Sequence, residues 1–401
     1  MVEQDRRRRL RRLLAAAGVL MAVAAVVLLV GDPFAEDGSG GGGDGGDVPE
    51  AGSRFRGEDR SLLDALRPVL AAEPASPPLP VEQAVAQLFA VGFEGREPPR
   101  ALLERMRSRA WGVVLVGATN YGSPSQVRDA VGALEEAARR GRQAPPLVAT
   151  EPAALGRLGP PPAPDIGLDG TPEEARAEAL DAARRLRSAH VRMVLGPSAD
   201  LAVGGGPSAE RGFSDDPREA AAFVEAAVRG WKEARVVVAP GRFPGEGGAS
   251  QDPLFGAATV GLSVDELLRR DVEPFRGAVR AGADAVQMSA ALFAAWDGVT
   301  PATVLPDAVR FLRSSTGFRG AVVSADLVAV TAATGGGVAR AAVEAVRAGC
   351  DLLVLAGGAA EQEAAYQGLL AAVRSGEVPR DRLDEAVRRV AAMKAAAQAP
   401  R

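Results

Sequence analysis

The chain has 401 residues, enough for one large domain or two ordinary ones, and 47% of them are hydrophobic, so a sizeable core is available. Six arginines give residues 1–12 a charge of about +4, whereas the rest of the chain is near −8. This negative balance argues against nucleic-acid binding by the folded part. The single cysteine, Cys350, excludes an intrachain disulfide.

Residues 13–30 form an uninterrupted apolar segment without a charged side chain. As a helix it would span about 27 Å, which is enough for a bilayer core. The basic segment before it, residues 1–12, predicts a cytoplasmic N-terminus, a single-pass anchor in the cell membrane and an extracytoplasmic domain. A cleaved signal peptide is the alternative, but its apolar region would be shorter and the small-residue cleavage site is poor here.

A linker is expected over residues 31–80. Its stretch GSGGGGDGGD, residues 38–47, is typical of flexible coil, because it has no apolar surface to bury. Residues 58–72 have the pattern of a short amphipathic helix, and residues 73–80 are rich in proline. We therefore expect the globular domain over residues 81–397.

The globular part alternates short apolar runs with helical patterns. Four helix starts carry an N-cap residue and a Glu or Gln three positions later: Ser123, Thr171, Asp216 and Ser263. Eight runs are apolar on both faces and predict buried parallel strands: residues 89–93, 112–116, 147–151, 191–196, 235–240, 284–289, 321–325 and 351–357. This α/β pattern predicts a (β/α)8 TIM barrel. A doubly wound open sheet is the alternative, weakened because no GxGxxG follows the first run.

Five fragments, taken in order, carry a resemblance to a known family. They are VEQAVAQLFAVGFEG (81–95), AERGFSDDP (209–217), RFPGEG (242–247), GFRGAVVSAD (317–326) and AGCDLLVLAGG (348–358). Together they resemble the N-terminal barrel domain of glycoside hydrolase family 3, in its β-N-acetylhexosaminidase-like branch. The resemblance implies a TIM barrel and retaining hydrolysis of a glycosidic bond by a carboxylate nucleophile and a proton donor.

The resemblance also locates the family's catalytic positions in this chain. The nucleophile, which in the family directly follows the serine of the seventh strand, is Ala325 here. The branch's acid/base is an Asp–His pair; Asp252 matches the aspartate, but the histidine position is Leu254. The catalytic motifs are therefore degenerate, because the nucleophile and the histidine of the acid/base pair are both replaced.

Further positions of the family's sugar site differ as well. The Lys-His pair that grips the sugar is Gly241-Arg242, and the second histidine of the KHFPGHG motif is Glu246. The aspartate that contacts the sugar after the third strand is Glu151, whereas the arginine of the fourth loop is retained as Arg211.

Asp326 stands one residue beyond the family's nucleophile position. Adjacent residues of a strand point to opposite sides, so with Ala325 facing the pocket, Asp326 is expected to cap the next helix or form a buried ion pair. Only a one-residue slip or a bulge would turn its carboxylate into the pocket.

Glu151, Asp200, Arg211, Arg242 and Tyr121 are the predicted substrate-binding residues, because all follow the carboxyl ends of predicted strands. For the charged residues the alternative is that they tie loops to one another, as Arg–carboxylate pairs often do. For Tyr121 the alternative to stacking on a sugar ring is packing against the core.

The sequence predicts neither a metal site nor a cofactor, since it has one histidine, His190, and no metal-binding spacing such as HExxH. The missing nucleophile favours a membrane-anchored family-3-like protein without hydrolytic activity. It would bind cell-wall sugar, such as the N-acetylglucosamine of peptidoglycan, or act as a surface scaffold. The alternative is an active retaining β-N-acetylhexosaminidase with Asp326 as nucleophile and Glu246 or Asp252 as acid/base.

Overall fold

The computed structural model describes residues 79–152 and 154–398. The predicted cytoplasmic segment 1–12, the apolar segment 13–30 and all but the last two residues of the linker lie outside the described residues. In the part of the chain that is described, no helix combines the length and the apolar character needed to cross a bilayer.

Eight short parallel strands form the main sheet, in the spatial order β5-β4-β3-β2-β1-β10-β9-β7. Each lies within one of the predicted apolar runs except that β9 extends one residue further, so the strand prediction is confirmed, although most strands are shorter than their runs. Their bounds are β1 Phe89–Val91, β2 Val113–Leu115, β3 Leu147–Thr150, β4 Met193–Val194, β5 Val237–Val238, β7 Ala285–Gln287, β9 Ala321–Asp326 and β10 Leu352–Leu355. A separate pair, β6 Thr259–Val260 and β8 Leu292–Phe293, was not predicted.

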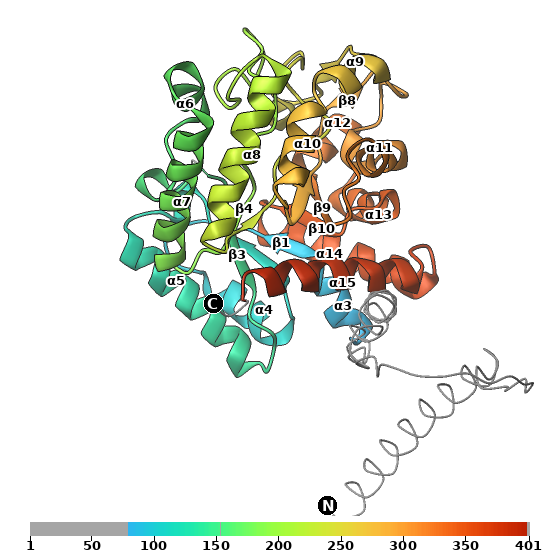
Figure 1. Ribbon diagram of the computed structural model, residues 1–401. Helices are drawn as coiled ribbons and strands as arrows, with labels where there is room; N and C mark the ends of the chain where they lie inside the picture. The colour runs from blue at the N-terminus through green and yellow to red at the C-terminus, as the bar shows by residue number, and fades with distance from the viewer. Residues whose placement is uncertain (1–78, 153, 399–401) are drawn as a thin grey trace, which may run out of the picture. The chain divides into compact units, whose positions relative to one another are not determined.

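Helices surround the strands on the outside (Figure 1). Those that begin before β5 are α3 Val81–Gln87, α4 Arg100–Ser108, η1 Ala118–Asn120, α5 Pro124–Arg140, η2 Gly156–Leu158, α6 Ala163–Asp169, α7 Pro172–Ser188 and α8 Pro217–Glu233. Those after β5 are η3 Pro253–Phe255, α9 Val264–Arg269, α10 Glu273–Arg280, η4 Ala302–Val304, α11 Pro306–Thr316, α12 Leu327–Thr334, α13 Val338–Ala348, α14 Ala359–Ser375 and α15 Arg380–Ala396.

The four predicted N-caps are confirmed. Ser123 caps α5, Thr171 caps α7, Asp216 caps α8 and Ser263 caps α9, each by accepting a hydrogen bond from a backbone N–H of the first turn. Each cap fixes the residue at which its helix begins, because the N-cap side chain accepts a hydrogen bond from a backbone N–H that would otherwise lack a partner.

Hydrogen bonds beyond the regular strands bring the two edges of the sheet together. Gln287 N donates to Pro240 O at 2.9 Å, and Phe243 N donates to Gln287 O at 2.8 Å. The sheet is therefore a nearly closed parallel barrel, which is consistent with the predicted TIM barrel.

The barrel has an interior and an exterior apolar layer. Successive residues of one strand alternate between them: Val113 belongs to the inner cluster and Val114 to the outer cluster that packs under the helices. Val390 and Met393 of α15 join the inner cluster, and α15 contacts both β5 and β9 (Figure 1). The last helix therefore covers the amino-terminal end of the barrel, and the carboxyl-terminal end stays available for a site.

Candidate functional site

A cavity of about 430 Å³ lies at the carboxyl ends of the strands. We call it the first cavity. All eight strand ends contribute to its wall, and one lining residue from each, in strand order from β1 to β10, is Glu94, Thr119, Glu151, Leu195, Arg242, Gln287, Asp326 and Val354. This is the end of the barrel at which TIM-barrel sites are built.

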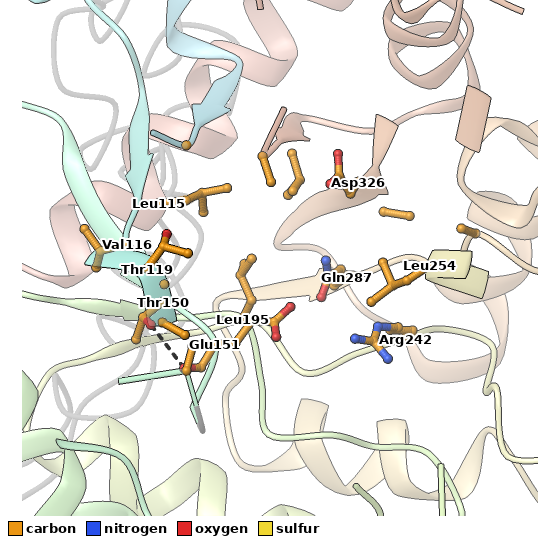
Figure 2. Close-up of a pocket in the computed structure, with 18 of the residues that line it drawn as sticks. Leu115, Val116, Thr119, Thr150, Glu151, Leu195, Arg242, Leu254, Gln287 and Asp326 are labelled. Carbon is orange, nitrogen blue, oxygen red and sulfur yellow. Dashed lines mark hydrogen bonds between the residues drawn. The ribbon is translucent and has the colours of Figure 1, made fainter. Parts of the chain in front are cut away.

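Polar and apolar side chains face one another across this cavity (Figure 2). Leu115 of β2, Thr119 of η1 and Glu151, the residue after β3, lie on one side, while Asp326 and Arg242 lie on the opposite side. The wall therefore offers carboxylates, a guanidinium group and hydrocarbon surface, a mixture typical of small-molecule sites.

Two residues that the resemblance assigns to catalytic positions have hydrocarbon side chains and line the first cavity. Ala325, which the resemblance assigns to the nucleophile position, is among the lining residues and is 5% exposed. Leu254, which the resemblance assigns to the acid/base histidine position, lines the cavity from η3 and is 47% exposed. Neither side chain can attack an anomeric carbon or transfer a proton.

The end of β9 contains a register shift. Leu352 of β10 pairs with Val323, but Val354, two residues on, pairs with Asp326, three residues on. The Ser324 hydroxyl contributes to this bulge, because its Oγ accepts the hydrogen bond of Val354 N at 2.9 Å. β9 therefore contains one extra residue, and its side chains do not alternate strictly as expected from the sequence. Ala325 and Asp326 both line the first cavity.

Asp326 is also the N-cap of α12. Its Oδ1 accepts a hydrogen bond from Val328 N at 3.1 Å, so the predicted capping role is confirmed. Burial raises the pKa of Asp326, against the hydrogen bonds from Val328 and Ala356, and the carboxylate of Glu151 raises it further. Asp326 therefore combines a structural contact with exposure to the cavity.

Glu246 and Asp252 are held by two arginines. Arg211 Nη1 donates to Asp252 Oδ2 at 2.6 Å, and Arg211 Nη2 lies 3.5 Å from Glu246 Oε2. Arg242 Nη1 donates to the same Glu246 oxygen at 3.4 Å, while Ser289 Oγ donates to Glu246 Oε1 at 2.7 Å. The two candidate acids thus have fixed partners on their oxygens.

The surroundings of the two carboxyl groups shift their pKa values in opposite directions. Burial raises the pKa of Glu246 to about 7, although the Arg242 guanidinium acts in the opposite direction. Partial burial works against ionisation of Asp252 too, but the Leu254 N–H and the Arg211 guanidinium lower its pKa below the usual value. Burial would lower the pKa of Arg242, yet the surrounding carboxylates, Glu246 first, raise it.

Three predicted substrate-binding residues do not line the first cavity. Asp200 is 2% exposed and accepts hydrogen bonds from Glu246 N at 2.8 Å and from Ser198 Oγ at 3.2 Å, so it positions the loop that carries Glu246. Tyr121 packs partly buried against the core, as its alternative expected. Arg211 faces a neighbouring cavity and reaches the site only through its ion pairs.

Two residues that contribute to the site were not predicted from the sequence. Gln287 lines the cavity from β7, and its Nε2 donates to Ser324 O at 3.4 Å. A polar residue inside the apolar run DAVQMS was the signal that could have found it. Asn120 supports the rim, because its Nδ2 donates to Phe93 O and Gly95 O at 2.9 and 2.7 Å.

Comparisons with known proteins agree with this architecture. The family model described as "Glycosyl hydrolase family 3 N terminal domain" matches residues 80–393. A beta-hexosaminidase of Stenotrophomonas maltophilia (strain K279a) is 32% identical over 131 residues, which is 32% of this chain and 39% of that protein. The match to this curated relative therefore spans about two fifths of the relative's length.

Solved structures show the same likeness over more of the chain. A family 3 beta-N-acetylglucosaminidase from Paenibacillus sp. str. FPU-7 superposes with a TM-score of 0.74 at 28% identity, covering 81% of this chain and 64% of that one. LpqI of M tuberculosis superposes with a TM-score of 0.69 at 27% identity, covering 82% and 96%. Because the family model matches well over half of the residues, this chain belongs to glycoside hydrolase family 3, through the N-terminal domain of that family.

Proposed function

We propose that this chain is a membrane-anchored family 3 protein that binds an amino sugar of the cell wall in the first cavity without hydrolysing it. The observation that carries the proposal is the pair Ala325 and Leu254, which place hydrocarbon at the nucleophile and acid/base positions of the same cavity. The names of the relatives, beta-hexosaminidase and beta-N-acetylglucosaminidase, support an N-acetylhexosamine such as that of peptidoglycan as the ligand.

The polar wall of the cavity supports sugar binding. Glu151, Arg242, Gln287 and Asp326 supply both donors and acceptors, and the volume of about 430 Å³ lies in the range of small-molecule pockets. Loss of the covalent nucleophile alone removes several powers of ten in rate. A cavity that keeps hydrogen-bonding groups but lacks the reacting groups suits a protein that binds a sugar without hydrolysing it.

A second candidate is an active retaining glycosidase that uses Asp326 as the nucleophile. Two observations favour it: the bulge in β9 brings Asp326 to the cavity wall, and the pKa of Glu246 is raised to about 7, which suits a general acid near neutral pH. The two candidates differ in a single measurable property, turnover.

The turnover of p-nitrophenyl N-acetyl-β-glucosaminide separates them. We expect the wild-type protein to release no more nitrophenol than the buffer, and Asp326→Asn to behave identically. Asp326→Asn is the suitable variant because an amide oxygen still caps α12 while the nucleophile is removed. Turnover by the wild type that Asp326→Asn abolishes would establish the second candidate instead.

Binding is measured independently by calorimetry with N-acetylglucosamine and with soluble muropeptides. We expect binding by the wild type, and about tenfold weaker binding by Gln287→Ala, because one hydrogen-bonding group of the wall is lost. Glu361→Gln on the exposed start of α14 is the control with unchanged affinity. If the folded protein binds none of these sugars, the sugar-binding proposal fails and the role of a surface scaffold remains as the hypothesis.

The membrane location is a separate part of the proposal. We propose that residues 13–30 anchor the chain, with residues 1–12 in the cytoplasm and the barrel outside. The full chain should stay in the membrane fraction after a carbonate wash, and protease added to intact cells should digest the barrel. Release of the full chain by carbonate would contradict the anchor, as would its recovery with a shortened N-terminus.

A further inference from the structure

The charged groups in the wall of the first cavity do not balance. Among the described residues that line it, only Arg242 carries a cationic side chain, whereas five carry carboxyl groups: Glu94, Glu151, Glu246, Asp252 and Asp326. Arg242 Nη1 lies 3.4 Å from Glu246 Oε2, and Arg211 Nη1 lies 2.6 Å from Asp252 Oδ2. The other three carboxyl groups form no ion pair with any described residue.

Two of these three carboxyl groups face each other. Glu151 and Asp326 lie on opposite sides of the first cavity (Figure 2). Burial raises the pKa of Asp326, and the Glu151 carboxylate raises it further, so the two negative charges repel each other. A cation bound between them would offset this repulsion.

The same wall contains an unused hydrogen-bond acceptor. Gln287 lines the first cavity and is 8% exposed. Its Nε2 donates to Ser324 O at 3.4 Å, but no described residue donates a hydrogen bond to its Oε1, and this oxygen remains accessible. A mostly buried acceptor without a donor is unfavourable, so a ligand N–H at this point would be stabilised.

Several donors of the wall, in contrast, are already engaged. Asn120 Nδ2 donates to Phe93 O and Gly95 O at 2.9 and 2.7 Å. Thr150 Oγ1 donates to Glu151 O at 3.1 Å. The first cavity therefore suits a ligand that brings positive charge and N–H donors better than one that brings acceptors.

We propose that the first cavity prefers an amino sugar with a free, protonated amino group over its N-acetylated form, and that this ammonium group lies between Glu151 and Asp326. An ammonium group has a charge and three donors, whereas an acetamide group is neutral and has one donor and one acceptor oxygen. Gln287 Oε1 accepts one of the ammonium hydrogen bonds. The inference rests on the proposed function, because it assumes that the first cavity holds an amino sugar.

Calorimetry at mildly acidic pH, where a sugar ammonium keeps its proton, compares glucosamine, N-acetylglucosamine and cyclohexylamine. We expect glucosamine to bind at least about tenfold more tightly than N-acetylglucosamine, because hydrogen bonds to charged groups are stronger than neutral ones. Cyclohexylamine carries the ammonium group on a ring without hydroxyl groups. It should bind about tenfold more weakly than glucosamine, because the hydrogen bonds of the hydroxyl groups are lost.

Two variants test the carboxylates through the ratio of the two sugar affinities. Glu151→Gln removes a charge at an exposed position and should lower the ratio by at least about threefold. Asp326→Asn, which keeps an oxygen to cap α12, should lower it similarly. Glu173→Gln makes the same change at an exposed position of α7 outside the cavity lining and should keep the ratio of the wild type.

Each outcome decides the proposal. A preference for glucosamine that Glu151→Gln or Asp326→Asn reduces supports it, even where N-acetylglucosamine does not bind. Equal affinities, or tighter binding of N-acetylglucosamine, overturn the inference and leave the proposed function intact. A preference that persists unchanged in both variants also overturns it, as does cyclohexylamine bound as tightly as glucosamine. If neither sugar binds to the folded wild type, the proposed function fails and the inference fails with it.

Discussion

The carboxyl group of Glu246 is buried against two guanidinium groups and the hydroxyl of Ser289, and is 1% exposed. Burial opposes its ionisation more than Arg242 favours it, so its pKa rises from 4.5 to about 7. The unfolded chain releases this proton at lower pH than the folded chain. Its contribution to stability is therefore complete below pH 4.5 and is lost as the pH rises through about 7.

The variant Glu246→Gln removes this titration while keeping an oxygen acceptor for Ser289. Relative to the wild type, its free energy of unfolding should increase between pH 5 and pH 8, by at most about 1.4 kcal/mol per pH unit. Urea denaturation at several pH values measures the difference. Glu361→Gln, the same change at an exposed position, is the matched control. A flat difference for Glu246→Gln would contradict the assignment.

At the scale of elements, the junction between β9 and α12 decides what Asp326 does. The bulge that turns its side chain toward the cavity also leaves it at the start of α12, where Val328 N is an orphaned donor. One carboxylate thus terminates a strand, begins a helix and borders the site. Different substitutions of Asp326 therefore distinguish its structural role from a catalytic role.

Asp326→Ala should lower the free energy of unfolding by about 1 kcal/mol, because the cap is lost. Asp326→Asn should differ from the wild type by a few tenths of that, since Asn caps nearly as well and needs no buried charge. Chemical denaturation at neutral pH measures both. Equal losses in the two variants would show that the charge, and not the cap, stabilises this junction.

At the scale of the whole molecule, a second charged cluster ties the amino-terminal end of the barrel. Asp351, fully buried before β10, accepts a hydrogen bond from Val322 N at 2.9 Å. Its oxygens lie 2.8 Å from Arg382 and 3.3 Å from Arg389, both on α15, and 3.6 Å from Arg313 on α11. This one side chain connects two strands with the helix that covers the end of the barrel.

Asp351→Ala would leave these arginines without their shared buried partner. We expect a loss of about 3–5 kcal/mol in the free energy of unfolding, typical of breaking a buried ion pair from one side. Asp384→Ala removes the partly exposed pair with Arg380 on the same helix and should cost less than about 1 kcal/mol. Similar losses in the two variants would contradict the special position of Asp351.

Features that depend on local pattern were predictable. The eight strands were found because strands buried on both faces read as continuous apolar runs. The caps at Thr171 and Ser263 were found because a capping box is set by residues three positions apart. Strict alternation misplaced Asp326, because the bulge depends on a hydrogen bond between Ser324 and the distant Val354.

By itself the sequence determined the alternation of strands and helices, the family, and the hydrocarbon side chains at Ala325 and Leu254, since residue identity and short-range periodicity suffice for these. The tertiary structure alone decided that Arg211 joins Asp252 to Glu246, that Asp326 borders the first cavity, and that a second cavity adjoins it. These features arise where loops far apart in the chain converge, and there one residue of strand register redirects a side chain.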